Sequence, residues 1–187
     1  MDLDRLHHHG TLDDSRRGDP PRRVTPGRRE AGAVIRVLVV CTGNTCRSPL
    51  AEALLRRTIE ETGRTDIAVT SAGTGAWDGA PASEGSYLVA LEHGLDLSAH
   101  RARLLTRAMV EESQLVLTMS RTHLARVREL GGAGRAHLLG EFSGFTGARG
   151  EIDDPFGGDL EEYRATLKTL AGIMRAVVAR LNGSTPS

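Results

Sequence analysis

The sequence has few aromatic residues, a single lysine and no long apolar run. Aromatic side chains make up 3% of the 187 residues, and 24 basic residues balance 24 acidic ones at a net charge of zero. A neutral chain of this composition gives no indication that it binds nucleic acid or an acidic membrane surface. No stretch approaches the roughly 20 apolar residues of a membrane span, and no signal-peptide pattern occurs. We therefore expect neither nucleic acid nor a membrane among its partners.

Cysteine is also scarce. The two cysteines, Cys41 and Cys46, are separated by four residues within one short segment. A secreted protein held together by disulfides needs more cysteines, spread along the chain to link distant loops. Two neighbouring thiols in an otherwise cysteine-free chain are typical of reduced, chemically active cysteines, so we expect a cytoplasmic protein.

Residues 1–33 differ in composition from the rest of the chain. They contain the run His7-His8-His9, three prolines, and arginine pairs interleaved with aspartates, with almost no apolar periodicity. Such a segment cannot bury enough apolar surface to fold, so we predict a disordered N-terminal tail over residues 1–33. Three adjacent histidines in a flexible segment make a poor metal site, and we expect no metal ion or other cofactor. One folded domain is predicted over residues 34–183.

Strand and helix patterns alternate from Val34 onward. Short apolar runs typical of buried strands occupy residues 34–40, 67–71, 114–119 and 136–139. Helices are predicted from Ser48 as N-cap, over 83–93, over 122–130, and from Asp159, with Glu162 completing a capping box. The buried face of the last helix is predicted to comprise Leu160, Tyr163, Leu167, Leu170, Met174, Val177 and Leu181. This alternation predicts an α/β fold, a doubly wound, small four-stranded parallel sheet flanked by helices.

The loop after the first strand has the features of a phosphate-binding loop. In a parallel sheet it lies at the carboxyl end of a strand, where the following helix offers free N–H groups and a partial positive charge. Gly43 and Asn44 accept left-handed backbone angles, which a tight loop requires. The five residues that would turn their N–H groups toward phosphate oxygens are Thr42, Gly43, Asn44, Thr45 and Cys46.

Cys41 and Arg47 stand at the two ends of this loop. The planar guanidinium of Arg47 matches two phosphate oxygens, and the same positive field stabilises the thiolate form of Cys41 as a nucleophile. Taken singly, such residues are more often a buried strand-end cysteine and a surface arginine. Their position between a buried strand and a capped helix favours the catalytic interpretation.

Residues 37–52, VLVVCTGNTCRSPLAE, closely resemble the low-molecular-weight protein tyrosine phosphatase family. The resemblance continues through the segments 71–74, 100–103 and 115–119, and ends in Asp153–Gly157 and the last helix, so that it spans residues 34–181. It implies an enzyme that hydrolyses phosphorylated side chains of protein substrates through a phosphocysteine. The oligomeric state is left open.

The resemblance assigns the chemical steps to three residues. Cys41 would be the nucleophile and Arg47 the phosphate clamp. Asp154, just before Pro155, would protonate the leaving group and then activate water, since one carboxylate can take back the proton that it gave. Asp153 is interpreted as a neighbour that tunes Asp154, or as a solvated loop carboxylate, rather than as the acid itself.

The resemblance also implies supporting roles. Asn44 would hold the shape of the loop with help from His100, and Ser48 would donate a hydrogen bond that eases departure of the Cys41 thiolate. Cys46 would form a reversible disulfide with Cys41 under oxidation. On residue type alone, Cys46 fits a small buried apolar filler equally well.

Three positions bear on the substrate, and they do not agree. Thr45 stands where tyrosine-directed members of the family carry a bulkier aliphatic residue, whereas arginine-directed members have threonine. Phe156 lies in a segment that also resembles the arginine-directed type. Trp77 stands where tyrosine-directed members place an aromatic wall, but a partly buried core ring and a ring stacked on a guanidinium are alternatives. The balance slightly favours phosphoarginine over phosphotyrosine.

Other functional classes fit the sequence less well. An arsenate reductase of this fold needs further cysteines downstream, and the chain has none after Cys46. A phosphoprotein-binding module or redox sensor without catalysis would typically lose the nucleophile, the clamp or the acid, and all three are present. A metal-dependent phosphatase would need a tight cluster of Asp and His ligands in the folded region.

Overall fold

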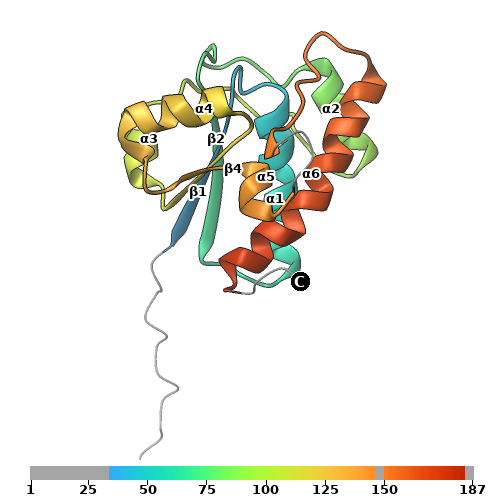
Figure 1. The fold of residues 1–187 in the computed structure, drawn as a ribbon. Coiled ribbons are helices and arrows are strands. Elements are labelled where there is room, and N and C mark those ends of the chain that lie inside the picture. Colours follow the sequence, from blue (N-terminus) through green and yellow to red (C-terminus); the bar gives the residue numbers. More distant parts are fainter. Residues whose placement is uncertain (1–33, 146–149, 184–187) are drawn as a thin grey trace, which may run out of the picture. The chain divides into compact units, whose positions relative to one another are not determined.

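The computed structural model describes residues 34–145 and 150–183. A four-stranded sheet forms their centre, with all neighbouring strands parallel and in the order β2-β1-β3-β4 (Figure 1). The strands are β1 Ile35–Cys41, β2 Ile67–Gly73, β3 Leu115–Thr118 and β4 Ala136–Leu138. The helices are α1 Arg47–Glu61, α2 Glu84–Glu92, α3 Arg107–Glu112, α4 Arg121–Val127, the turn η1 Arg128–Gly132, α5 Leu139–Ser143 and α6 Leu160–Leu181. The predicted fold class is confirmed.

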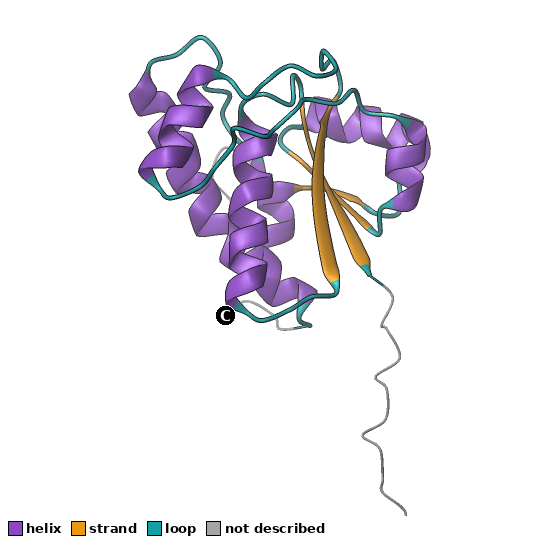
Figure 2. Ribbon diagram, turned by 180° about the vertical axis from the view of Figure 1, so that it is seen from behind, coloured by secondary structure: helices purple, strands orange, loops and turns teal. Residues whose placement is uncertain are grey.

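Helices cover both faces of the sheet, as Figure 2 shows. Successive side chains of a strand point to opposite faces, so β1 contributes to two separate apolar clusters. Val37, Val39 and Cys41 pack with residues of α1 and α6, whereas Leu38 and Val40 pack with residues of α3 and α4. β1 is therefore buried on both sides, which explains its unbroken apolar sequence.

The order of the strands places β1 where the chain reverses its direction of winding. From β1 the chain passes to β2 on one side of it and later to β3 on the other. The loops that follow β1 and β3 therefore diverge at the carboxyl edge of the sheet and leave a crevice between them. The predicted phosphate loop leads into this crevice.

Some boundaries differ from those expected. The first helix begins at Arg47 with Cys46 as N-cap, and not with Ser48 as N-cap, because the chain enters the helix while it closes the loop. The short helices α3 and α5, of six and five residues, were not predicted, since so few residues give no clear period. Leu160 and Leu181 of α6 are half-buried rather than buried.

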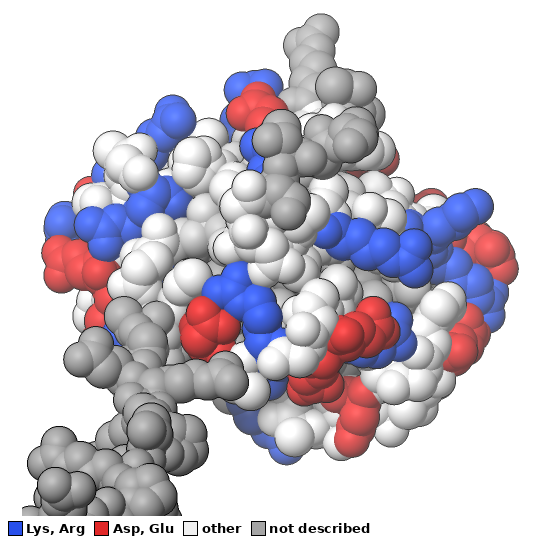
Figure 3. Space-filling model, turned by 90° about the horizontal axis from the view of Figure 1, so that it is seen from below, with Lys and Arg blue, Asp and Glu red and all other residues white. Residues whose placement is uncertain are grey.

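The tail predicted over residues 1–33, including its histidine run, lies outside the described residues. On the face seen in Figure 3, basic and acidic side chains lie beside one another rather than in patches of one sign. Within the described part of the chain, no helix is long and apolar enough to cross a membrane.

Candidate active site

The loop Thr42–Cys46 connects β1 to α1 in a tight turn. Asn44 has a φ of 54° and is the single non-glycine residue with a left-handed backbone among the described residues. The segment after β2 lies against the loop, because Thr74 N donates to Cys41 O at 2.9 Å and Gly75 N donates to Thr42 O at 3.0 Å. The loop is thus held at its base by the neighbouring strand.

Asn44 uses all of its polar atoms in the site. Its side-chain nitrogen donates to Ser48 Oγ at 2.9 Å and to Ser71 Oγ at 2.8 Å. Its side-chain oxygen accepts from Arg103 N at 2.9 Å, and its carbonyl oxygen lies 2.7 Å from His100 Nε2. A fully buried, fully bonded asparagine offsets the strain of its backbone and fixes the shape of the loop.

The sulfur of Cys41 has two polar neighbours, one in the loop and one in the first turn of α1. Asn44 N donates to Cys41 Sγ at 3.2 Å, and Ser48 Oγ lies 3.0 Å from the same sulfur. Ser48 Oγ already accepts a hydrogen bond from Asn44, so its own hydrogen is available to point at the sulfur. Both contacts place donors where negative charge on sulfur would be stabilised.

Arg47 connects the loop to the segment before α6. Its guanidinium forms an ion pair with the carboxylate of Asp154 and donates to Ile152 O at 3.2 Å. The Arg47 side chain is 6% exposed, whereas that of Asp154 is 45% exposed. The Nε of Arg47 is buried and has no hydrogen-bond partner among the described residues.

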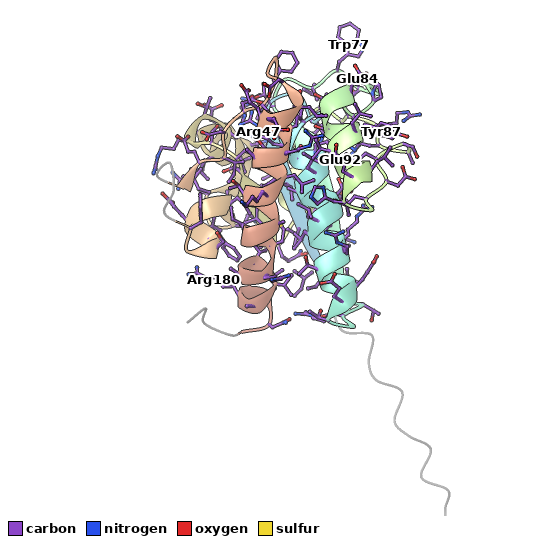
Figure 4. All side chains as sticks on the ribbon, turned by 90° about the vertical axis from the view of Figure 1, so that its right-hand side faces the viewer. Arg47, Trp77, Glu84, Tyr87, Glu92 and Arg180 are labelled. Atoms are coloured by element: carbon purple, nitrogen blue, oxygen red, sulfur yellow. The ribbon has the colours of Figure 1, made fainter. Side chains whose placement is uncertain are left out.

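A cavity of about 160 Å³ joins the predicted catalytic residues. It is lined by Cys41, Thr42, Gly43, Thr45, Cys46, Arg47, Asp154 and Phe156. Trp77 does not line it and is 84% exposed, which excludes a core position (Figure 4). A larger hollow of about 550 Å³ lies behind the loop, where Ser71, His100 and Arg103 support Asn44 from outside.

Cys46 points toward α2 and α6. Its thiol donates to Ser83 Oγ at 3.3 Å and lies 3.7 Å from the hydroxyl oxygen of Tyr163. Both cysteines are buried and neither is in a disulfide. Burial raises the pKa of the Tyr163 hydroxyl, so this tyrosine stays neutral near Cys46 at ordinary pH. The redox role of Cys46 stays a prediction.

Three polar residues, Glu52, Ser71 and His123, were not expected from the sequence to belong to the site. Ser71 donates to Glu52 and accepts from Asn44, and His123 Nε2 lies 2.8 Å from Thr42 Oγ1. Burial, together with the charge of Arg47, lowers the pKa of His123 to about 4. The pattern around Ser71 and His123 is that of an ordinary strand end and helix, so no local signal marks either residue.

No group of three or more His, Cys, Asp or Glu side chains in the described ranges is placed to hold a metal ion.

A parallel α/β sheet whose first strand ends in a cysteine, and whose first helix begins with an arginine at the same cavity, defines a cysteine-dependent phosphatase. Residues 36–186 match the low molecular weight phosphotyrosine protein phosphatase family, and the chain belongs to it.

The relatives cover most of the chain. The probable low molecular weight protein-tyrosine-phosphatase EpsP of Ralstonia solanacearum is 38% identical over 145 residues, 76% of this chain and 91% of the relative. The protein-arginine-phosphatase of Bacillus subtilis (strain 168) is 33% identical over 145 residues, 78% and 95% of the two chains. The structure of the YwlE arginine phosphatase from Geobacillus stearothermophilus superimposes with a TM-score of 0.71 at 34% identity, covering 80% of this chain and 94% of that one.

Proposed function

We propose that this phosphatase hydrolyses phosphoarginine side chains of proteins through a phosphocysteine at Cys41. The observation that carries the chemistry is that Cys41, Arg47 and Asp154 line one and the same cavity. The fold brings Asp154 there from 107 positions beyond Arg47 in the sequence. A nucleophile, a cation and a carboxylic acid at one small cavity are the parts that phosphoryl transfer to cysteine needs.

The reaction proceeds in two displacements. In the first, the Cys41 thiolate attacks phosphorus and forms the S–P bond, while the bond from phosphorus to the side-chain nitrogen breaks and protonated Asp154 gives its proton to that nitrogen. In the second, Asp154 as carboxylate takes a proton from water, whose oxygen attacks phosphorus. The new O–P bond forms as the S–P bond breaks, phosphate leaves, and the electron pair of the broken bond makes Cys41 a thiolate again.

The loop supplies the charge stabilisation for both steps. The buried Nε of Arg47, which has no partner in the described part of the chain, is a donor suited to a phosphoryl oxygen. The hydroxyl of Ser48 and the N–H of Asn44 stabilise the sulfur when it carries negative charge during attack and departure. Asn44, supported by His100, keeps these groups in place.

The preference for phosphoarginine rests on Thr45 and Phe156. Both line the cavity, and Thr45 gives its wall a short side chain with a hydroxyl, which suits a polar guanidinium better than a phenyl ring. Phe156 is 77% exposed, so its ring is available to stack on the guanidinium plane. The relatives include both tyrosine and arginine phosphatases and therefore do not decide between the substrates.

The test compares matched phosphoarginine and phosphotyrosine peptides with the wild type, Thr45→Ile and Cys41→Ser. We expect a higher kcat/KM for phosphoarginine in the wild type and a shift toward phosphotyrosine in Thr45→Ile, because the larger apolar wall favours a phenyl ring. Thr65→Ile is the matched control, since Thr65 is exposed next to the amino end of β2 and far from the cavity along that strand.

Each outcome has a distinct meaning. A wild type that prefers phosphotyrosine overturns the arginine preference and makes exposed Trp77 the candidate substrate contact. Turnover that persists in Cys41→Ser, measured with a chelator present, overturns the phosphocysteine mechanism itself.

A further inference from the structure

His123 is a buried histidine that the proposed reaction does not use. It lies on α4, directly after β3, and is 4% exposed. Its Nε2 is 2.8 Å from Thr42 Oγ1, and its Nδ1 is 2.8 Å from Ser120 Oγ. The imidazole therefore joins the phosphate loop after β1 to the N-cap of the helix after β3, across the crevice of the sheet.

The direction of these two hydrogen bonds decides what Thr42 can offer to the cavity. A neutral imidazole carries one hydrogen, on either Nδ1 or Nε2. With hydrogen on Nδ1, Nε2 accepts the hydroxyl hydrogen of Thr42, and only lone pairs of Thr42 remain for a ligand. With hydrogen on Nε2, the imidazole donates to Thr42 Oγ1, and the Thr42 hydroxyl keeps its own hydrogen as a donor.

An anionic ligand distinguishes these two states. Thr42 lines the cavity together with Cys41 and Arg47, where the proposed function places a phosphoryl group. A hydroxyl that donates to a phosphoryl oxygen is favourable, whereas one that presents lone pairs to it is repelled. Ser120 Oγ is able to stabilise the imidazole with its hydrogen on Nε2. It can donate its own hydrogen to Nδ1 of His123 while it accepts from His123 N at 3.4 Å.

We propose that His123 is a positioning residue that, held by Ser120 with its hydrogen on Nε2, fixes the Thr42 hydroxyl as a donor to the phosphoryl group. The proposal rests on the proposed function of the loop. His123 touches neither the substrate nor the sulfur in this scheme, and it transfers no proton. It acts through the orientation of Thr42 alone.

The surroundings of His123 keep its imidazole neutral during catalysis. Burial disfavours a positive charge on the ring, and Arg47 on α1 repels it, so the pKa of His123 falls to about 4. The carboxylates of Asp154 and Glu151, before α6, act in the opposite direction and are outweighed. At pH 5 to 8 the imidazole therefore has one hydrogen to place, as the proposal requires.

The kinetic test is a double-mutant cycle on a phosphopeptide that the wild type hydrolyses. Thr42→Val and His123→Leu should each lower kcat/KM by about tenfold, the effect of losing one hydrogen bond to a charged group. The double variant should be no worse than either single one. His123→Gln should recover most of the activity, because its amide places an N–H donor near the position of Nε2 and an acceptor for Ser120.

Loss of helix capping provides a matched control. Ser120 caps α4, and Thr106 caps α3 by accepting from Met109 N at 3.3 Å. Ser120→Ala and Thr106→Ala each lose one N-cap, but only Ser120→Ala frees Nδ1 of His123. We expect a similar fall in Tm for both and a fall in kcat/KM for Ser120→Ala alone. Equal effects on kcat/KM would show that Ser120 acts through stability, which overturns the proposal.

The hydrogen on the imidazole can be observed directly. Nitrogen-15 NMR of the His123 ring in the full chain, with inorganic phosphate added, should show a neutral ring with hydrogen on Nε2 between pH 5 and 8. Hydrogen on Nδ1, additive losses in the cycle, or no recovery in His123→Gln would each overturn the role of His123. These failures leave the phosphocysteine mechanism standing as long as Cys41→Ser is inactive, whereas an active Cys41→Ser removes both.

Discussion

Asp154 shows how much of the proposed mechanism depends on a single side chain. Its carboxylate is 45% exposed and paired with Arg47 at the mouth of the cavity, a position from which it can reach a leaving group. We expect Asp154→Ala to lower kcat by roughly 100-fold for substrates with poor leaving groups, since general acid catalysis contributes that much or more. Activated aryl phosphates need less protonation and should lose much less.

Asp153 offers a matched control for this prediction. It is exposed and adjacent to Asp154, but it does not line the cavity with Cys41. Steady-state kinetics with phenyl phosphate and p-nitrophenyl phosphate should show the dependence on the leaving group in Asp154→Ala and little change in Asp153→Ala. The same loss for both phosphates would argue against Asp154 as the acid.

The residues of the site divide by how far apart they lie in the sequence. Cys41, Asn44 and Arg47 are close neighbours, and the strand–loop–helix context was enough to predict that they share a loop. His123 meets Thr42 across 81 positions, and Ser71 meets Asn44 across 27. Such contacts depend on which strands are neighbours and in what register, and the sequence carries no local signal for either.

Among the elements, β2 supports the loop Thr42–Cys46 with its carboxyl end. Gly73 is the last residue of β2, and a Cβ there would lie 2.4 Å from Thr42 O and 2.8 Å from Asn44 N. Because both atoms belong to the backbone, the loop must shift to accept a methyl group. We expect Gly73→Ala to lower the free energy of unfolding by about 1–3 kcal/mol and to weaken inhibition by inorganic phosphate.

Gly75→Ala, two positions further on, is the control that distinguishes this steric effect from a general effect of replacing glycine with alanine. A Cβ on Gly75 would have no heavy atom within 4 Å, and the residue keeps its N–H bond to Thr42 O. Urea unfolding and phosphate inhibition should therefore stay close to wild type in Gly75→Ala. If the two variants behaved alike, the close approach of β2 to the loop would not be what shapes the phosphate site.

The elements themselves were predictable where their period was long. The strands appeared as apolar runs because β1 and β3 are buried on both faces, and α6 showed its apolar period over 22 residues. The start of α1 was placed wrongly because Ser48 is a typical N-cap residue. In the structure the Ser48 hydroxyl contacts Asn44 and Cys41 instead of capping the helix. Serine serves in both ways, so its residue type alone does not locate the start of α1.

The whole fold determines how stability depends on pH, because folding buries His123 between two loops. The pKa of His123 falls from 6.5 to about 4 on folding, so the unfolded chain binds a proton at a higher pH than the folded protein does. Between these values the unfolded state holds more protons, and stability falls as pH decreases. Above pH 6.5 the burial of neutral His123 costs the folded protein no stability through protonation. By pH 4 the protonation of this residue in the unfolded chain lowers the free energy of unfolding by about 3 kcal/mol.

His123→Gln removes this titration while it keeps a polar side chain between Thr42 and Ser120. The free energy of unfolding of the variant should therefore fall less steeply than that of wild type between pH 6.5 and 4, with parallel curves above pH 7. Urea unfolding at a series of pH values measures both slopes. The two proteins share every other titratable group, so the difference between the curves measures His123 together with its interactions with Asp154 and Glu151. Curves that stayed parallel down to pH 4 would mean that the folded protein protonates His123 as easily as the unfolded chain does, and the buried connection between the β1 and β3 loops would then be open to water.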